Sequence, residues 1–301
     1  MCRLTIFTAT YNRGHLIDRL YRALQRQEIF DFEWLVIDDG SQDNTEELFA
    51  QWQQEENPFS IRYYRQENKG LISALNYGVE LAKGEYFAKI DSDDYIVDYY
   101  MKNIYSWIDQ IQDCSDVYAV AGLRVTPDGK PLKGIWPKIP ETPGYVDATD
   151  LERSKYDLDA DMSEAWRTEV LREHPFPIWP GEKFAPEQLV LYQIAAEGLK
   201  LRWFPVPMCI CEYQEGGLTL GASKLEKQNP MGYAMMYNQY IRLYPEIRNQ
   251  FRNAMQMTAL SFYAGHLEYL QQSNSRLATI LSFPLGIVLG FRRKYQYSKI
   301  K

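Results

Sequence analysis

Cysteine is scarce in this 301-residue chain, and the few thiols are badly placed for cross-links. The four cysteines are Cys2, Cys114, Cys209 and Cys211. Cys209 and Cys211 alternate on a predicted strand, so they share a face but cannot easily bond to each other. A zinc site would need a second close pair, which the sequence lacks. Free thiols therefore indicate a reducing cytoplasm.

Basic charge and long apolar runs are scarce as well. The chain has 33 Lys and Arg against 40 Asp and Glu, a net charge of −7, so nothing predicts a nucleic-acid partner. No apolar run reaches the roughly 20 residues of a membrane-spanning helix. The opening sequence MCRLTIFTAT enters a strand at once, which predicts no signal peptide. We therefore expect a cytoplasmic protein without nucleic-acid partners.

The common glycine-rich nucleotide-binding loops are also missing. No G-x-G-x-x-G follows the first predicted strand, and no G-x-x-x-x-G-K-[ST] occurs anywhere. Dehydrogenases and P-loop enzymes are therefore disfavoured. A protein that binds phosphates without such a loop can use a divalent cation held by carboxylates.

What the sequence does have is strand–helix alternation over its first hundred residues. Predicted strands cover residues 4–9, 32–38, 61–65 and 85–90. Helices are expected between them, the second capped by Asn44 or Thr45 and the third stopped by Gly84. This alternation predicts right-handed crossovers and an α/β fold with a mainly parallel sheet.

Polar residues end three of these strands. They are Thr10, Tyr11 and Asn12 after the first strand, Asp38 and Asp39 after the second, and Asp91, Asp93 and Asp94 after the fourth. Ligands of such sheets bind beyond the carboxyl ends of the strands, so the three groups should share one edge. Three carboxylates this close repel one another and need a positive partner. The D-x-D segment could hold Mg²⁺ or Mn²⁺ with a nucleotide diphosphate; the alternative is that Asp94 or Asp98 caps the next helix.

Beyond Asp98 the pattern is less regular. A strand is expected at 116–125, a turn at 127–129, and long loops with short elements over 131–186. A helix should cover 187–197 and end at Gly198, with strands at 201–204 and 209–213. Gly216 and Gly217 predict a mobile segment, and the chain looks helical from Pro230 onward.

Three segments together resemble the nucleotide-binding half of family 2 glycosyltransferases, which have the GT-A fold. They are TIFTATYNRGHLIDRLYRAL, FEWLVIDDGSQDNTEEL and RQENKGLISALNYGVELAKGEYFAKIDSDD. The resemblance is close over residues 3–100, continues weakly to about 215, and does not cover the helical C-terminus. It implies a GT-A catalytic domain over 1–225, with a nucleotide-sugar half at 1–100 and an acceptor half at 101–225. A helical extension would follow at 226–301.

The resemblance also implies roles for the polar strand ends. Thr10, Tyr11, Asn12 and Asp39 would hold the nucleobase with Asp38 nearby, Asp91 would meet ribose, donor sugar or metal, and Asp93 would be the metal ligand. Lys69 lies just before a helix N-terminus, which favours anions, so it would meet the diphosphate or remain a solvated surface lysine.

The family supplies its catalytic base from a Glu-Asp pair that opens a helix. Here the segment GEKFAPEQLVLYQIAAEG has Glu187 followed by Gln188, with Pro186 suited to a first helical position. We assign the base to Glu187 and keep Glu182 in reserve. The alternative for Glu187 is a carboxylate that merely favours the helix dipole.

The predicted function is an inverting, metal-dependent glycosyltransferase. It would move one sugar from a nucleotide sugar, with UDP-sugars preferred, to a hydroxyl of a glycan or lipid-linked acceptor. A single addition is expected because Arg202-Trp203 lacks the preceding glutamine of processive synthases. Two alternatives stay open: a sugar nucleotidyltransferase, and a nucleotide-sugar or glycan-binding module that has lost its base.

The C-terminal sequence RLATILSFPLGIVLGFRRKYQYSKIK has a pattern of its own. From Leu277 to Phe291 the residues are apolar or small apart from Thr279 and Ser282, and basic residues flank the run. As a helix it would rise only about 22 Å, and Pro284 and Gly286 should interrupt it. We predict peripheral attachment of 277–301 to the inner face of the plasma membrane. The alternative is a terminal helix packed on the core.

Overall fold

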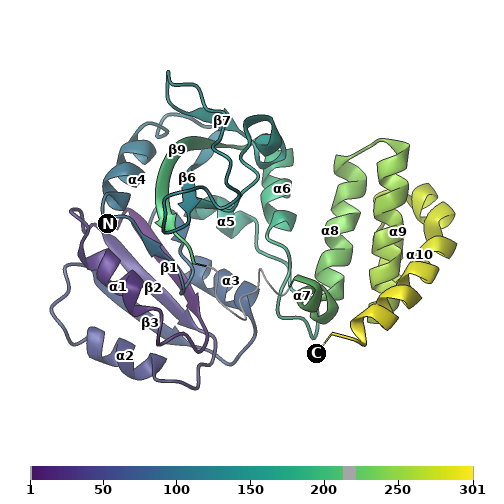
Figure 1. Ribbon diagram of the computed structural model, residues 1–301, viewed down its shortest axis with the longest axis horizontal. Helices are drawn as coiled ribbons and strands as arrows, with labels where there is room; N and C mark the ends of the chain where they lie inside the picture. The colour runs from purple at the N-terminus through teal and green to yellow at the C-terminus, as the bar shows by residue number, and fades with distance from the viewer. Residues whose placement is uncertain (1, 213–221, 301) are drawn as a thin grey trace. The chain divides into compact units, whose positions relative to one another are not determined.

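A computed structural model describes residues 2–212 and 222–300, and the chain divides into two compact units (Figure 1). The first, which we call the sheet unit, comprises Met1–Pro175 and Leu191–Gln214. The second, the helical unit, comprises Phe176–Val190 and Glu215–Lys301. The predicted mobile glycines, Gly216 and Gly217, lie outside the described residues.

The sheet unit alternates strands and helices along its first part. In order these are β1 (Leu4–Thr10), α1 (Asp18–Gln25), β2 (Phe32–Asp38), α2 (Thr45–Trp52), β3 (Ser60–Arg65), α3 (Leu71–Leu81) and β4 (Tyr86–Lys89). The later elements of the sheet unit are β5 (Tyr95–Ile96), α4 (Tyr100–Asp109), β6 (Val117–Val125), β7 (Val146–Ala148), η1 (Asp150–Tyr156), β8 (Met162–Arg167), α5 (Thr168–Glu173) and β9 (Lys200–Ile210). The helix α6 (Gln188–Ala196) has residues in both units.

One sheet joins these strands in the order β3-β2-β1-β4-β8-β6-β9-β5, with β7 paired to β9. The first four strands are parallel, so the predicted α/β fold is confirmed. Strand β8 then runs antiparallel between β4 and β6, inside a segment expected to form loops with short elements. Because β2 extends the sheet on one side of β1 and β4 on the other, a topological switch point lies at β1.

Both β1 and β2 are buried along almost their whole length, which explains why apolar residues predominate in them. Ile6 belongs to the core cluster that includes Leu20 of α1 and Ile104 of α4. Phe7 points to the opposite face, because successive strand residues alternate, and there it meets α3. A Cβ added to Gly78 of α3 would lie 2.2 Å from the Phe7 ring, so only glycine allows this close packing.

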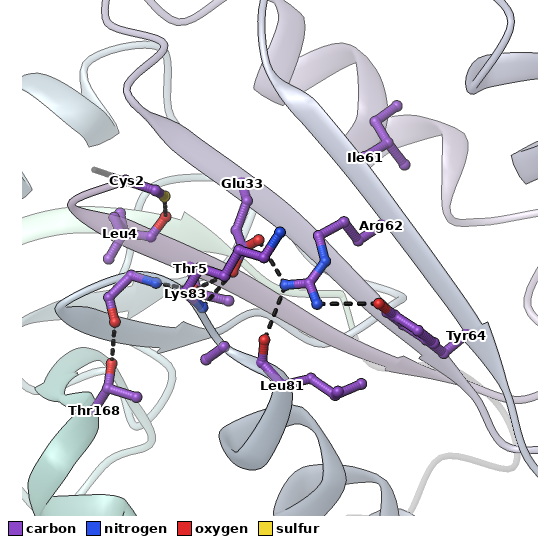
Figure 2. A network of polar contacts seen from close by, with 12 residues as sticks. Cys2, Leu4, Thr5, Glu33, Ile61, Arg62, Tyr64, Leu81, Lys83 and Thr168 are labelled. Carbon is purple, nitrogen blue, oxygen red and sulfur yellow. Dashed lines mark hydrogen bonds and ion pairs between the residues drawn. The ribbon is translucent and has the colours of Figure 1, made fainter.

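A buried polar network holds the amino ends of the parallel strands (Figure 2). Glu33 of β2 accepts hydrogen bonds from the Thr5 hydroxyl and from the main-chain N–H of Lys83, both at 2.7 Å. Arg62 of β3 forms an ion pair with Glu33 at 2.8 Å and also donates to the Leu81 carbonyl at 2.9 Å. The network ties β1, β2, β3 and the end of α3 together at the edge opposite the polar strand ends.

Two local predictions in the sheet unit were wrong. Gly84 does not stop α3, which ends at Leu81; it is required because an added Cβ would lie 2.3 Å from the Thr5 nitrogen. The predicted strands at 201–204 and 209–213 are one strand, β9, which ends at Ile210 so that Cys211 follows it. Register shifts against β6 let β9 continue through its two prolines.

The helical unit packs three long helices side by side (Figure 1). Its elements are α7 (Ala222–Gln228), α8 (Pro230–Leu243), α9 (Ile247–Ala264), η2 (Leu267–Gln272) and α10 (Arg276–Tyr297). The predicted interruption at Pro284 and Gly286 was wrong: α10 continues through both, because Gly286 packs closely on α9 while Pro284 lies on the exposed side. None of the described helices is long and apolar enough to cross a membrane.

Candidate functional site

The three polar strand ends meet at one edge of the sheet unit, as their positions predict. Thr10 pairs in register with Asp38, and the Asp39 N–H donates to the Thr10 carbonyl at 2.8 Å. On the other side of β1, the Ile90 N–H donates to the Phe7 carbonyl at 2.9 Å, which places Asp91 just beyond β4. The parallel course of β1, β2 and β4 causes this convergence at the switch point.

The loop after β1 is fastened to the loop after β2. Asn12 adopts the left-handed region with φ of 54°, its N–H donates to the Ser41 hydroxyl at 2.9 Å, and its side-chain oxygen accepts from the Gln42 N–H at 2.7 Å. The Tyr11 ring beside it is 45% exposed. The buried Thr10 hydroxyl has no hydrogen-bond partner within the described ranges. This loop therefore presents an aromatic face at the sheet edge, while the Thr10 hydroxyl lies buried.

The two carboxylates after β2 mainly position backbone. Asp38 accepts from the Ser41 N–H at 2.7 Å and the Tyr63 hydroxyl at 2.5 Å. Asp39 accepts from the Lys69 N–H and the Gly70 N–H, each at 2.8 Å. Asp39 is thus the anion that the chain places at the start of α3, where Lys69 was expected to favour a diphosphate.

The acid cluster after β4 is partly neutralised within the chain. One Arg124 nitrogen, Nη1, lies 2.6 Å from an Asp91 oxygen and 2.9 Å from an Asp94 oxygen. Burial acts to raise the pKa of the Asp91 carboxyl, but Lys89 and Arg124 hold it well below its usual range. Burial raises the pKa of Asp94 to about 7. Arg124 acts to lower this pKa, whereas the negative charge of Asp91 raises it further. Neither Asp94 nor Asp98 caps α4, whose N-cap Tyr99 has no side-chain hydrogen bond.

Asp93 differs from its neighbours because it is tied less tightly. Its side chain is 25% exposed and forms a long ion pair with Arg13, at 3.5 Å. Arg19 donates to the Asp93 carbonyl at 2.7 Å and holds the main chain in place. A carboxylate that is partly exposed, weakly paired and fixed through its backbone suits a hard divalent cation.

A second group of possible ligands lies behind the acid cluster. Ligand atoms of Asp94, Cys209 and Cys211 lie within 4.8 Å of one another, and the Cys211 thiol donates to Asp94 at 3.0 Å. The hydrogen bond with Cys209 and burial raise the pKa of the Cys211 thiol, which disfavours the thiolate that a metal requires. The Arg124 guanidinium on Asp94 would also repel a cation.

The two candidate bases belong to the helical unit, whereas Asp93 belongs to the sheet unit. The Glu182 carboxylate accepts the Met231 N–H at 2.6 Å and the Gly232 N–H at 2.9 Å, so both its oxygens anchor the start of α8. Burial raises the pKa of Glu182, opposed by these two hydrogen bonds. Glu187 is partly buried in a turn directly before α6; the helix begins at Gln188, so Pro186 does not take the first helical position that was predicted for it.

Sequence reasoning missed the arginines of this edge. Arg124 is the next-to-last residue of the otherwise apolar strand VYAVAGLRV, and a lone charge there is itself a signal of a buried counter-charge. Arg13 and Arg19 carry no such signal. They meet Asp93 only because the β1–α1 segment folds back over the end of β4, a long-range contact without a local pattern.

Comparisons with known proteins agree with this geometry. Residues 5–149 match the family described as Glycosyl transferase family 2. The glycosyltransferase GlyG of Streptococcus pneumoniae is 30% identical over 108 residues, 36% of this chain and 35% of that protein. The putative glycosyltransferase EpsH of Bacillus subtilis is 33% identical over 93 residues, 31% of this chain and 26% of that protein. The matched part thus spans about a third or less of these relatives.

Two solved structures share the fold over nearly the whole chain. TarS 1–349 of S. aureus, in complex with UDP-GlcNAc, has a TM-score of 0.61 and 15% identity, and covers 98% of this chain and 92% of its own. The mannosyltransferase PcManGT of Pyrobaculum calidifontis, in complex with GDP-Man and Mn²⁺, has a TM-score of 0.59 and 18% identity. The match covers 98% of this chain and 87% of the PcManGT chain. At these identities the likeness concerns the fold alone.

Proposed function

Because the chain belongs to the family 2 glycosyltransferases and has their GT-A fold, we propose that it transfers one sugar from a nucleotide sugar to a hydroxyl group of an acceptor. The observation that carries the proposal is the convergence of three polar strand ends at the switch point of the sheet. That edge offers an aromatic face and a partly exposed carboxylate for a nucleotide and a cation.

In this proposal the donor nucleotide lies on the loops after β1 and β2. The exposed Tyr11 ring stacks on the nucleobase, with Thr10 and Asn12 beside it in the chain. Asp39 has accepted three hydrogen bonds, so it retains room for about one more from the base, with Asp38 behind it. UDP-GlcNAc and GDP-Man in the two structures of like fold support a nucleotide sugar as donor, and a UDP-sugar is our first choice.

The divalent cation, Mn²⁺ or Mg²⁺, would be held by Asp93. Its weak pairing with Arg13 leaves the carboxylate available, whereas Asp91 is engaged by Arg124 and so is better placed to orient ribose or donor sugar. A bound cation supplies charge stabilisation to the diphosphate as it leaves. Arg13, released from Asp93, adds a second positive charge near the same phosphates. Lys69 is the further candidate for diphosphate contact.

The base of the reaction is proposed to be Glu187. It would take the proton of the acceptor hydroxyl while that oxygen attacks the anomeric carbon from the face opposite the diphosphate, which inverts the configuration. Glu182 is the weaker choice because α8 occupies both its oxygens. The acceptor is proposed to be a glycan or a lipid-linked oligosaccharide, met in the cytoplasm with residues 277–301 in peripheral contact with the inner membrane face.

A panel of nucleotide sugars tests the donor assignment. Thermal stabilisation of the full chain is measured with each sugar nucleotide, with and without Mn²⁺, and the hits are then followed for release of nucleoside diphosphate. We expect stabilisation by one nucleotide class only with the cation, and slow hydrolysis of that donor. Stabilisation without any release would support a binding module instead.

A further inference from the structure

The last helix of the helical unit packs with its small side chains and exposes its large ones. Buried residues of α10 include Ala278, Ser282, Gly286 and Gly290, spaced four apart so that they form one stripe against α9. A Cβ added at Gly286 or Gly290 would lie 2.6 Å from the nearest atom of α9. Small residues at this contact let the backbones of α10 and α9 approach closely, which leaves the large side chains of α10 on its other faces.

The opposite face of α10 is apolar along most of its length. The exposed large side chains are Leu277, Ile280, Leu281, Phe283, Leu285, Val288 and Phe291. A water-facing helix normally reverses this arrangement, with polar groups outside and large apolar groups in the core. A contiguous exposed surface of this kind marks an interaction site rather than ordinary exposure.

A cavity of about 500 Å³ extends this apolar surface at the start of the helix. It is lined by Leu270, Gln271, Arg276, Thr279, Ile280 and Phe283. Its lining is largely apolar, with the Arg276 side chain contributing a cation. Such a groove has the chemistry to take an acyl chain with an anionic head group beside it.

The charge of this segment selects among possible occupants of the apolar face. Residues 276–301 contain six Lys or Arg and no Asp or Glu, in a chain whose net charge is −7. If a second copy packed antiparallel on this face, Arg276 would approach Arg292 and Lys294 of the other copy with no acid on either helix to compensate. An anionic lipid surface complements the same charges instead.

We infer that α10 docks on a bilayer containing anionic lipid, with its apolar face at the headgroup–acyl boundary and its basic ends on the lipid phosphates. The helix lies on the membrane and does not cross it, consistent with the absence of a membrane-spanning candidate among the described helices. The inference rests on the helical unit alone and holds whether or not the donor proposal is correct.

Sedimentation of the full chain with lipid vesicles tests this surface. Vesicles of phosphatidylcholine alone are compared with vesicles that also contain phosphatidylglycerol, at low and at high ionic strength. We expect binding to the anionic vesicles that weakens with salt, and little binding to the neutral ones. Failure to bind anionic vesicles at low salt would overturn the inference.

Matched variants locate the contact. Leu281→Asp with Val288→Asp should weaken binding by roughly tenfold or more, because it places charge in the apolar boundary. Ile247→Asp, on α9 and 87% exposed, adds a carboxylate elsewhere and should leave binding unchanged. Leu281 and Val288 are 61% and 66% exposed, so the double variant should keep the thermal midpoint of the wild type. An unchanged midpoint would show that weaker binding is not caused by misfolding.

The basic residues are tested separately. Arg292→Gln with Lys294→Gln should weaken binding roughly fivefold for each charge removed, whereas Arg242→Gln with Arg248→Gln on the other helices should not. Sedimentation velocity of the wild type and of the Leu281→Asp, Val288→Asp chain tests whether the apolar face of α10 instead binds a second copy. A wild-type dimer that the double variant dissociates, without vesicle binding, would assign the face to self-association and overturn the lipid proposal.

Discussion

Asp91, Asp93 and Asp94 follow one strand but have three different surroundings. Arg124 binds the first and third at 2.6 and 2.9 Å, while Asp93 faces Arg13 at 3.5 Å. Two of the three carboxylates therefore already have a positively charged partner within the chain. Arg124 pairs with both outer carboxylates and Lys89 also pairs with Asp91, so we propose the middle carboxylate, Asp93, as the ligand of a donor-bound cation.

Asp93→Asn should therefore abolish cation-dependent donor binding. The amide keeps the size of the side chain but removes the charge that holds a hard divalent ion, so affinity for donor with Mn²⁺ should fall by roughly 100-fold or more. Calorimetric titration with donor and Mn²⁺ measures the change. Asp98→Asn, which removes an exposed carboxylate paired to Arg26, serves as control and should bind like the wild type. Equal affinity in both variants would contradict the assignment of Asp93.

The buried carboxyl of Asp94 should make stability depend on pH. Its pKa of about 7 in the folded chain lies above the ordinary value near 3.9, so the folded state binds more protons between these two pH values. Stability from this group is complete below about pH 4 and is lost as pH rises toward 7. Asp94→Asn should remove this loss of stability, which is on the order of 4 kcal/mol for a pKa difference of about three units.

Urea unfolding from pH 4 to pH 8 checks this sign. The wild type and Asp94→Asn should converge at acidic pH, with the variant the more stable of the two near neutrality. The asparagine can still accept from Arg124 and the Cys211 thiol, so packing is preserved. Parallel pH profiles for the two proteins would show that Asp94 does not titrate in this range.

The two glutamates before α6 should separate chemistry from stability. Glu187→Gln should leave donor binding intact and lower turnover roughly 10²- to 10⁴-fold, the usual scale for a general base. Glu182→Gln weakens the anchor on Met231 and Gly232, so it should lower the thermal midpoint with a smaller effect on turnover. Turnover rates and melting curves of both variants distinguish the two roles. Loss of turnover in Glu182→Gln with turnover retained in Glu187→Gln would assign the base to Glu182.

At the scale of elements, the Glu33 network fixes the strands that carry the site. The Glu33 and Arg62 side chains are only 4% and 15% exposed, so either charge alone would be costly. Glu33→Gln should lower the free energy of unfolding by about 3 kcal/mol, because Arg62 is left buried without its counter-charge. Denaturant unfolding measures this loss.

A surface pair provides the comparison for that measurement. Asp18 and Arg22 form an exposed pair on α1, and Asp18→Asn should cost at most about 0.5 kcal/mol. Adding Arg62→Met to Glu33→Gln should recover part of the lost stability, since it removes the stranded charge. If Glu33→Gln behaves like the surface control, the network does not stabilise the strand ends.

Elements with strong local patterns were predictable from the sequence, whereas those made by distant contacts were not. Strand β2 has the predicted bounds because its run of apolar residues is bracketed by polar ones. Strand β8 was missed because MSEAWR lacks a clear apolar run and acquires its strand form between β4 and β6. The cap of α2 was also mistaken: Asn44 makes no side-chain cap bond, and Asp43 accepts from Thr45 instead.

The candidate site likewise has features that local patterns predict and features that only distant contacts create. Co-location of Thr10, Asp38 and Asp91 follows from strand direction, which the alternation of elements predicts. The partners Arg13 and Arg124 arrive from segments far apart in sequence, so no spacing rule could supply them. For the same reason the sequence could name Asp93 but could not tell that its neighbours were already paired.

For the molecule as a whole, we propose donor binding by the sheet unit and lipid contact by the helical unit. Charge follows this division, because a chain with a net charge of −7 ends in a segment with six basic residues and no acidic ones. The vesicle experiments and the donor experiments can therefore fail independently.

The central claim is metal-dependent use of a nucleotide sugar, and the release of nucleoside diphosphate by the full chain tests it most directly. The wild type, Asp93→Asn and Glu187→Gln are incubated with the donor that stabilises the protein best, with Mn²⁺ and with a chelator. The account predicts release by the wild type only with Mn²⁺, none by Asp93→Asn, and strongly reduced release by Glu187→Gln despite normal donor binding. Release that is unchanged by the chelator and by both substitutions would contradict it.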